Sequence, residues 1–167
     1  MVSAQSHAYA GEPCAPTDAN GPGCGASRVI ETNFGPVALD SGNSISLPRG
    51  LLGFSEHQDF ALTHLPDPRL EQFMLLQSLE EPQLSFLLLP LGEESDVLTD
   101  EDKSEIVQAL GLREVDVAFL FIVTIRKIGD GVTLTFNKRA PVVIDARTRT
   151  GFQHVLSNST YQIQQPL

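Results

Sequence analysis

Short apolar runs separated by turn-forming residues most constrain what this chain can fold into. The runs are rich in valine, isoleucine, leucine and phenylalanine, and glycine, proline, asparagine or aspartate lies between them at intervals of about ten residues. Such spacing is typical of antiparallel barrels and sandwiches. The expected strands cover residues 28–34, 37–39, 44–47, 60–62, 73–78, 84–90, 115–125, 132–137, 140–145 and 152–156. The sequence therefore predicts an all-β domain.

One segment, residues 100–110, predicts a short helix. Thr99 before it is a good N-cap, because its hydroxyl can accept a hydrogen bond from an amide of the first turn. Acidic residues fill that first turn, where they suit the exposed amides and the helix dipole. An apolar stripe follows, and Gly111 stands where a left-handed C-cap belongs.

The loop at 47–54 combines two glycines and a proline with large apolar residues. The glycines predict unusual backbone angles. A solvated loop rarely carries Leu51, Leu52 and Phe54 unless these side chains pack or bind something. Packing into the core of the β-domain is the simpler interpretation, and a partner-binding role is the alternative.

Acidic residues are concentrated in the middle of this 167-residue chain, whose net charge is −10. Residues 56–116 hold 15 acidic and 3 basic side chains, whereas residues 117–167 hold 2 acidic and 6 basic ones. An acidic surface repels phosphate backbones, so we expect no direct binding to nucleic acid. The same surface favours a basic protein partner, although acidity also simply keeps a protein soluble.

Residues 1–27 are rich in alanine, glycine, proline and serine and contain almost no large apolar residues. We expect a disordered tail there, followed by a single domain over residues 28–167. Cys14 and Cys24 fall in this tail at a spacing that fits no zinc pattern. The chain shows neither the basic and apolar regions of a secretion signal nor an apolar run long enough to span a bilayer. We therefore expect a cytoplasmic protein that does not use a membrane.

The sequence carries no pattern for catalysis or metal binding. His7, His57, His64 and His154 are spread along the chain without metal-ligand spacing. A hydrolase elbow and a phosphate-binding glycine loop are both missing. The acids that begin the helix lack the spaced ligands and central glycine of a calcium loop. We therefore expect neither an enzyme nor a bound cofactor or metal.

Several stretches, in the expected order, resemble the FliW family of flagellar assembly factors. They include the 49–54 loop and the 75–86 segment, in which Leu-Gln-Ser precedes an acidic turn and a phenylalanine-bearing strand. The other stretches are 122–125, 137–145, 147–156 and the terminal 165–167. The chain departs from the family at Leu47, where phenylalanine is usual, and at Leu52, where proline is common. Without that proline we expect a softer loop.

The resemblance implies a small antiparallel β-barrel with one short helix, in a cytoplasmic protein that is not an enzyme. It also implies two protein partners. The first is the carbon storage regulator CsrA, a basic RNA-binding dimer that members of the family prevent from repressing translation. The second is flagellin, which is bound through its terminal helical region and competes with CsrA. Free flagellin then releases CsrA to silence flagellin synthesis, and we expect the factor itself to be a monomer.

Two sets of residues are candidates for these contacts. An acidic face suits the basic CsrA, and the candidates are Glu80, Glu81, Asp100, Glu101, Asp102 and Glu105. The loop and groove candidates, which suit a flagellin helix, are Leu51, Leu52, Phe54, Gln77 and Ser78. A solvated helix face and plain barrel packing are the simpler explanations of the same residues. Two other functions stay open, namely a flagellin chaperone that acts without CsrA and a barrel that holds a small ligand inside.

Overall fold

The structure is a computed structural model that describes residues 28–92 and 95–167. The tail predicted for residues 1–27, with Cys14 and Cys24, lies outside these residues. The strands of the described part are β1 (Arg28–Thr32), β2 (Gly35–Leu39), β3 (Ser44–Ser46), β4 (Asp59–His64), β5 (Met74–Ser78), β6 (Ser85–Pro90), β7 (Val117–Ile128), β8 (Gly131–Phe136), β9 (Val142–Asp145), β10 (Thr150–Gln153) and β11 (Gln165–Pro166). Its helical elements are α1 (Asp100–Leu110) and the 3₁₀ turns η1 (Ser41–Asn43), η2 (Pro68–Leu70) and η3 (Glu114–Asp116).

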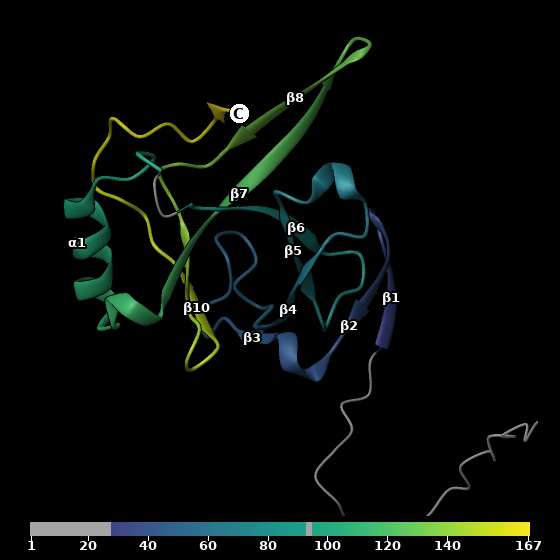
Figure 1. The fold of residues 1–167 in the computed structure, drawn as a ribbon, viewed down its shortest axis with the longest axis horizontal. Coiled ribbons are helices and arrows are strands. Elements are labelled where there is room, and N and C mark those ends of the chain that lie inside the picture. The colour runs from purple at the N-terminus through teal and green to yellow at the C-terminus, as the bar shows by residue number, and fades with distance from the viewer. Residues whose placement is uncertain (1–27, 93–94) are drawn as a thin grey trace, which may run out of the picture.

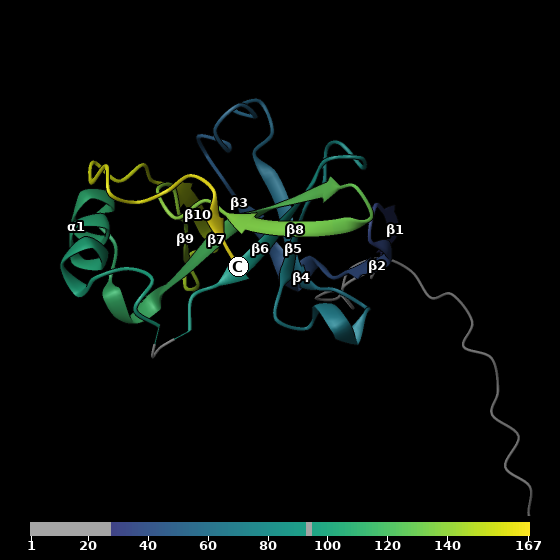
Figure 2. The ribbon, with the colours of Figure 1, turned by 90° about the horizontal axis from the view of Figure 1, so that it is seen from above.

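Seven of these strands close into a barrel (Figure 1). The order around the ring is β3, β4, β5, β6, β7, β9 and β10, and β10 returns to β3. All pairings in the ring are antiparallel except the last, in which Thr150 and Ser46 pair in parallel. The β1–β2 hairpin lies at one end of the molecule and α1 at the other (Figures 1 and 2). The prediction of a β-barrel with one short helix is therefore confirmed.

Side chains alternate between the two sides of the barrel wall, as the period-two geometry of strands requires. The inward residues form one buried apolar cluster: Ile45, Leu47, Leu51, Phe60, Leu76, Leu88, Leu120, Val142 and Ile144. Neighbouring residues point outward, and the β1–β2 hairpin, α1 and the C-terminal segment cover them. This outer cluster includes Ile30, Val37, Leu75, Leu87, Ile106, Phe121, Val143 and Leu156. The barrel interior is thus a packed core rather than a ligand chamber.

The helix α1 has the caps that its sequence predicts. The Thr99 hydroxyl accepts a hydrogen bond from the Asp102 N–H at 3.2 Å, and Gly111 takes the left-handed conformation with a φ of 66°. Ile106 and Val107 are buried, so the apolar stripe faces the protein and the acidic side faces solvent.

Most strand ends lie within two residues of the prediction, β7 and β10 each end three residues away from it, and the short strand β11 was not predicted. Strand β7 begins at Val117, because the residues before it form η3, and it continues to Ile128 rather than ending at residue 125. The extension is possible because β8 pairs with β7 as far as this end. Strand β10 ends before Leu156, which leaves the sheet to enter the outer apolar cluster.

The loop that follows β3 closes one end of the barrel. Leu47 and Leu51 are buried in the interior. The Gly50 N–H donates to the Leu47 carbonyl and the Phe54 N–H to the Leu51 carbonyl, each at 2.8 Å. Gly50 and Gly53 have positive φ angles of 61° and 87°, which their positions in these tight turns require.

Replacing Gly50 with alanine should destabilise the protein strongly. The added Cβ would lie 2.4 Å from the Phe54 carbonyl oxygen and 2.6 Å from the Ser55 Cα, in a backbone conformation that already disfavours a side chain. We expect a loss of about 3 kcal/mol in the free energy of unfolding, measured by urea denaturation followed by circular dichroism.

Gly53→Ala is the matched control for this measurement. Gly53 also has a positive φ, but no atom lies within 4 Å of its ideal Cβ. We therefore expect a loss of only about 1 kcal/mol, from backbone strain alone. Equal losses in the two variants would show that close packing around Gly50 does not matter.

Candidate protein-binding surfaces

The turn between β5 and β6 is built on two buried polar side chains, Gln77 and Ser78. Both are 0 % exposed. The Gln77 Nε2 donates to the carbonyl oxygens of Ser78 and Pro82 at 3.0 and 3.1 Å. The Ser78 Oγ accepts hydrogen bonds from the N–H groups of Glu80 and Glu81 at 3.3 and 3.1 Å. The structure thus places these two predicted contact residues beneath the surface, where they shape the turn.

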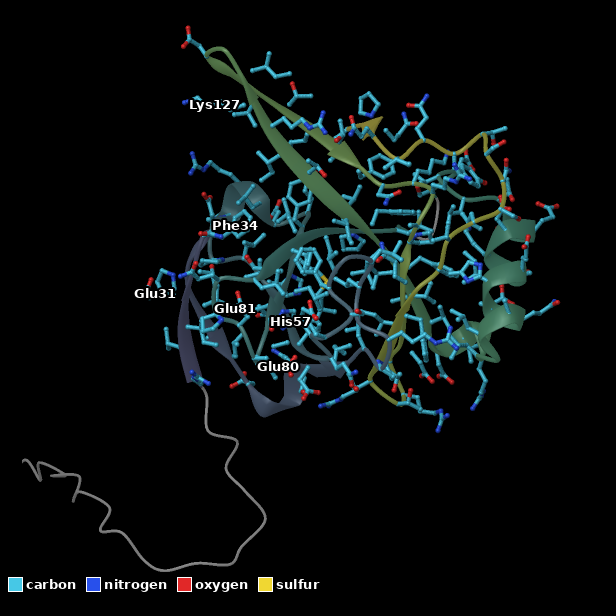
Figure 3. The ribbon with its side chains drawn as sticks, turned by 180° about the vertical axis from the view of Figure 1, so that it is seen from behind. Glu31, Phe34, His57, Glu80, Glu81 and Lys127 are labelled. Carbon is cyan, nitrogen blue, oxygen red and sulfur yellow. The ribbon has the colours of Figure 1, made fainter. Side chains whose placement is uncertain are left out.

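This turn presents Glu80 and Glu81 to solvent. The Glu80 carboxylate is held in place, because its Oε2 accepts from the Gln58 N–H at 2.9 Å and lies 3.7 Å from the His57 Nδ1. Figure 3 shows these residues on the same side of the molecule as Glu31 of β1, which is also exposed. We call Glu31, Glu80 and Glu81 together the acidic turn surface.

Glu31 did not emerge as a candidate from the sequence, although a local pattern places its side chain. Ile30 is buried in the outer cluster, so the alternation of β1 turns Glu31 outward. Its position on the same side of the molecule as the β5–β6 turn depends on where the β1–β2 hairpin packs, and local sequence does not contain that information.

The predicted acids of α1 lie at the other end of the molecule from the β1–β2 hairpin (Figures 1 and 3). Asp100, Glu101 and Glu105 are exposed, whereas Asp102 accepts a hydrogen bond from the Tyr161 hydroxyl. Burial, together with the Asp102 carboxylate, raises the pKa of Tyr161 above its ordinary value. The six predicted acids therefore form two separate groups rather than one face.

The three apolar loop candidates have different environments. Leu51 is 2 % exposed in the barrel interior, whereas Phe54 is 36 % exposed and packs edge to face on Phe86 with ring centroids 5.2 Å apart. Leu52 is 61 % exposed. Its N–H donates to the Gln153 Oε1 at 2.8 Å, a bond that a proline at this position could not make. This hydrogen bond holds the loop against β10.

A shallow groove of about 190 Å³ lies beside Leu52. Its lining residues are Leu52, Asn137, Arg139, Ala140, Val155 and Ile163. Val155 and Ile163 are 50 % and 60 % exposed, so the rim is apolar. Within the described part of the chain, the buried Nε of Arg139 has no hydrogen-bond partner. We call this site the Leu52 groove; its exposed side chains offer mainly apolar contacts.

The groove assembles from segments that the sequence keeps far apart. Leu52 follows β3, Arg139 precedes β9, and Val155 and Ile163 belong to the C-terminal segment after β10. The sequence indicated Leu52 because a large apolar residue in a glycine-rich loop is unusual. Nothing in the residues around 155 and 163 indicated that they would join it.

The described residues define a small β-barrel protein with a packed interior, whose loops and edges are the parts free to bind other molecules. Between residues 28 and 92 and between 95 and 167, no helix is long and apolar enough to cross a membrane. Over the same ranges, no three potential metal-ligating side chains gather at one point.

Comparisons with known proteins identify the family. A sequence model of the FliW protein matches residues 28–167. The flagellar assembly factor FliW of Bdellovibrio bacteriovorus is 35 % identical over 145 residues, which cover 83 % of this chain and 78 % of that protein. The factor of the same name from Geobacillus kaustophilus is 32 % identical over 143 residues, with coverages of 84 % and 94 %. A crystal structure of the flagellar assembly factor FliW matches with a TM-score of 0.64 and 28 % identity, over 83 % of this chain and 96 % of that one.

The chain therefore belongs to the FliW family of flagellar assembly factors. The family predicted from the motifs is confirmed, and so is the fold that it implied. The residues that contact partners remain predictions.

Replacing Gln77 with leucine should destabilise the β5–β6 turn. The change keeps a similar volume but leaves the buried carbonyl of Ser78 and the partly buried carbonyl of Pro82 without the donor that binds them. We expect a loss of about 2–3 kcal/mol in the free energy of unfolding, measured by urea denaturation. Gln83→Leu, at an exposed position of the same turn, should change stability by less than about 0.5 kcal/mol. Similar stability of the two variants would rule out the structural role of Gln77.

Proposed function

We propose that this chain controls flagellin synthesis in the cytoplasm by binding CsrA and flagellin in exchange for one another. CsrA binds the acidic turn surface and is kept from repressing translation, whereas flagellin binds the Leu52 groove and releases CsrA. Membership in the FliW family supports the identity of the two partners. One structural observation carries the exchange: a single loop takes part in both surfaces, because Leu52 lies at the groove and Gln58 binds the Glu80 carboxylate.

The Leu52 groove suits the apolar face of an amphipathic helix, such as the terminal helical region of flagellin. Leu52, Val155 and Ile163 are exposed aliphatic residues around one depression. Helices that dock into grooves place apolar anchors of this kind about one turn apart. Covering these side chains stabilises the complex by about 25 cal/mol for each Å² of apolar surface removed from water.

The acidic turn surface suits a basic RNA-binding protein such as CsrA. Glu31, Glu80 and Glu81 are exposed carboxylates that lie on one side of the molecule (Figure 3). Opposite charges raise the rate of association and fix the orientation of the encounter. The same negative charge repels RNA from the complex. The acids of α1 strengthen the long-range attraction from the far end of the molecule, without forming the contact.

The loop supplies a physical route for the exchange. Its Leu52 N–H binds the Gln153 side chain and its Gln58 N–H binds the Glu80 carboxylate, so the segment between them is fixed at both ends. A helix that displaces Leu52 therefore changes the position of Glu80 and weakens the binding of CsrA. Linkage requires the reverse effect to be equal, so bound CsrA lowers the affinity for flagellin by the same factor.

Leu52→Asp and Ile163→Asp should each weaken flagellin binding roughly tenfold or more, because a carboxylate in an apolar contact must be desolvated. Isothermal titration calorimetry with purified flagellin gives the dissociation constants. Val115→Asp is the control, because Val115 is 81 % exposed and does not line the groove. If flagellin binds all three variants with the same affinity as the unchanged protein, its binding site is not the Leu52 groove.

Reversing the charge of Glu80 and Glu81 to lysine should slow association with CsrA and flatten its dependence on salt. Stopped-flow measurements at several salt concentrations give both quantities. The Glu101→Lys/Glu105→Lys variant carries the same change in charge on α1 and should have a smaller effect on the rate. An unchanged salt dependence in the Glu80/Glu81 variant would exclude the acidic turn surface as the contact.

The exchange itself needs a separate control with the unchanged protein. Excess flagellin should release bound CsrA, and the Leu52→Asp variant should retain it under the same conditions. If flagellin and CsrA stay bound together, the exchange is wrong. If flagellin binds and CsrA never does, the chain is a flagellin chaperone without this regulator.

A further inference from the structure

Strands β7 and β8 extend beyond the barrel as a two-stranded arm (Figures 1 and 2). β6 pairs with β7 only as far as Val123, and β11 pairs with β8 only at Thr135 and Phe136. In the part of the chain that the structure describes, residues 124–128 of β7 therefore pair with β8 alone. We call the opposite, unpaired edge of residues 124–128 the β7 arm edge.

The arm carries large β-branched side chains in solvent. Ile125, Ile128 and Val132 are 47 %, 66 % and 65 % exposed. A two-stranded hairpin without a covering layer is marginally stable in water, and an apolar group of this kind on a projecting element marks an interaction surface. Lys127 lies on the same arm, away from the acidic turn surface (Figure 3).

The register of the arm determines which backbone groups face outward. The Asn137 N–H donates to the Ile122 carbonyl at 2.9 Å, which marks Ile122 and Asn137 as a hydrogen-bonded pair of β7 and β8. Antiparallel pairs alternate between bonded and non-bonded, so Ile125 and Lys127 fall at non-bonded positions. Their N–H and C=O groups therefore point away from β8, toward the β7 arm edge.

On the outer edge of β8, an outward-facing backbone group does form a hydrogen bond. Leu134 pairs with Ile125 at a non-bonded position, and its carbonyl accepts a hydrogen bond from the Leu167 N–H at 3.1 Å. The C-terminal segment thus occupies part of the β8 edge, while the corresponding groups of the β7 arm edge have no partner in the described residues. A strand that added to this edge would complete the ladder.

The charge of the arm indicates the chemistry of that strand. Arg126 and Lys127 are exposed bases in a protein whose net charge is −10. In an added strand, acidic residues opposite these bases and β-branched residues opposite Ile125 would each form favourable cross-strand pairs. We propose that the β7 arm edge binds an extended, acidic segment of a partner protein by strand addition. This site is separate from the Leu52 groove and from the acidic turn surface.

A lysine on an exposed edge also has a protective role, because it deters unwanted pairing between copies of a protein. The two roles of Lys127 have opposite consequences. If Lys127 is protective, the Lys127→Thr variant should self-associate. If Lys127 binds the partner, the same variant should bind an acidic strand more weakly.

Fluorescence anisotropy with the full chain tests the proposal. The probe is a short labelled peptide with the repeat valine-glutamate-glutamate, which can place valine opposite Ile125 and a glutamate opposite each of Arg126 and Lys127. A peptide with the repeat valine-lysine-lysine is the control ligand. We expect the acidic peptide to bind and the basic one to bind at least roughly tenfold more weakly. Lys127→Glu should reduce binding of the acidic peptide roughly tenfold, whereas Arg28→Glu, with the same change in charge on β1, should leave it nearly unchanged.

A backbone test separates strand addition from simple charge attraction. Ile125→Pro removes an outward N–H while sparing the bonds to β8, and Ile125→Thr removes the same apolar side chain but keeps that N–H. Binding should be lost in the proline variant and largely retained in the threonine variant. If the proline variant does not fold, amide exchange by NMR replaces it: the peptide should protect the amides of Ile125 and Lys127 in the unchanged protein.

Three results would overturn the proposal. The first is equal binding of the acidic and basic peptides, and the second is binding that leaves the amide exchange of Ile125 and Lys127 unchanged. The third is concentration-dependent self-association of Lys127→Thr in sedimentation experiments with undiminished peptide binding, which would assign Lys127 the protective role alone.

Discussion

Pairing along strand β7 is the interaction on which the rest of the structure depends. In succession along its length, β7 pairs with β9 over 117–120, with β6 over 120–123 and with β8 over 123–128. The first two pairings close the barrel, and the third extends beyond it. A long run of β-branched and aromatic residues suits both parts, because such residues fit a pleated surface whether it is buried or half exposed. One strand thus joins the packed core to the projecting arm.

Buried or partly buried polar side chains position both candidate surfaces on this barrel. Gln77 and Ser78 lie under the acidic turn and satisfy its backbone groups, so that Glu80 and Glu81 project to solvent. Gln153 does the same for the loop, because its Oε1 accepts from the Leu52 N–H. The sequence indicated Gln77 and Ser78 as contact residues and did not single out Gln153. In the structure each of these residues shapes a neighbouring segment.

Local patterns predicted most of the fold. The strands follow from apolar runs with turns between them, and the helix follows from the Thr99 and Gly111 caps, because these features depend on residues close in sequence. The motifs also identified the family. The predicted site residues differ in their exposure and in their position on the molecule. Leu52, Glu80 and Glu81 lie on exposed surfaces, whereas Gln77 is buried and the acids of α1 lie at the far end of the molecule.

The sequence by itself determined the all-β class, the single helix with its caps and the glycine-dependent loop at the end of the barrel, because backbone preference and side-chain alternation are local. Only the tertiary structure decided which surfaces exist. Closing the barrel brings Leu52, Val155 and Ile163 around one groove and places Glu31 on the same side of the molecule as the β5–β6 turn. Among residues 28–92 and 95–167, it also leaves one edge of the β7–β8 arm unpaired. These arrangements join residues that are distant along the chain, so they depend on how the elements pack and not on any pattern within a single element.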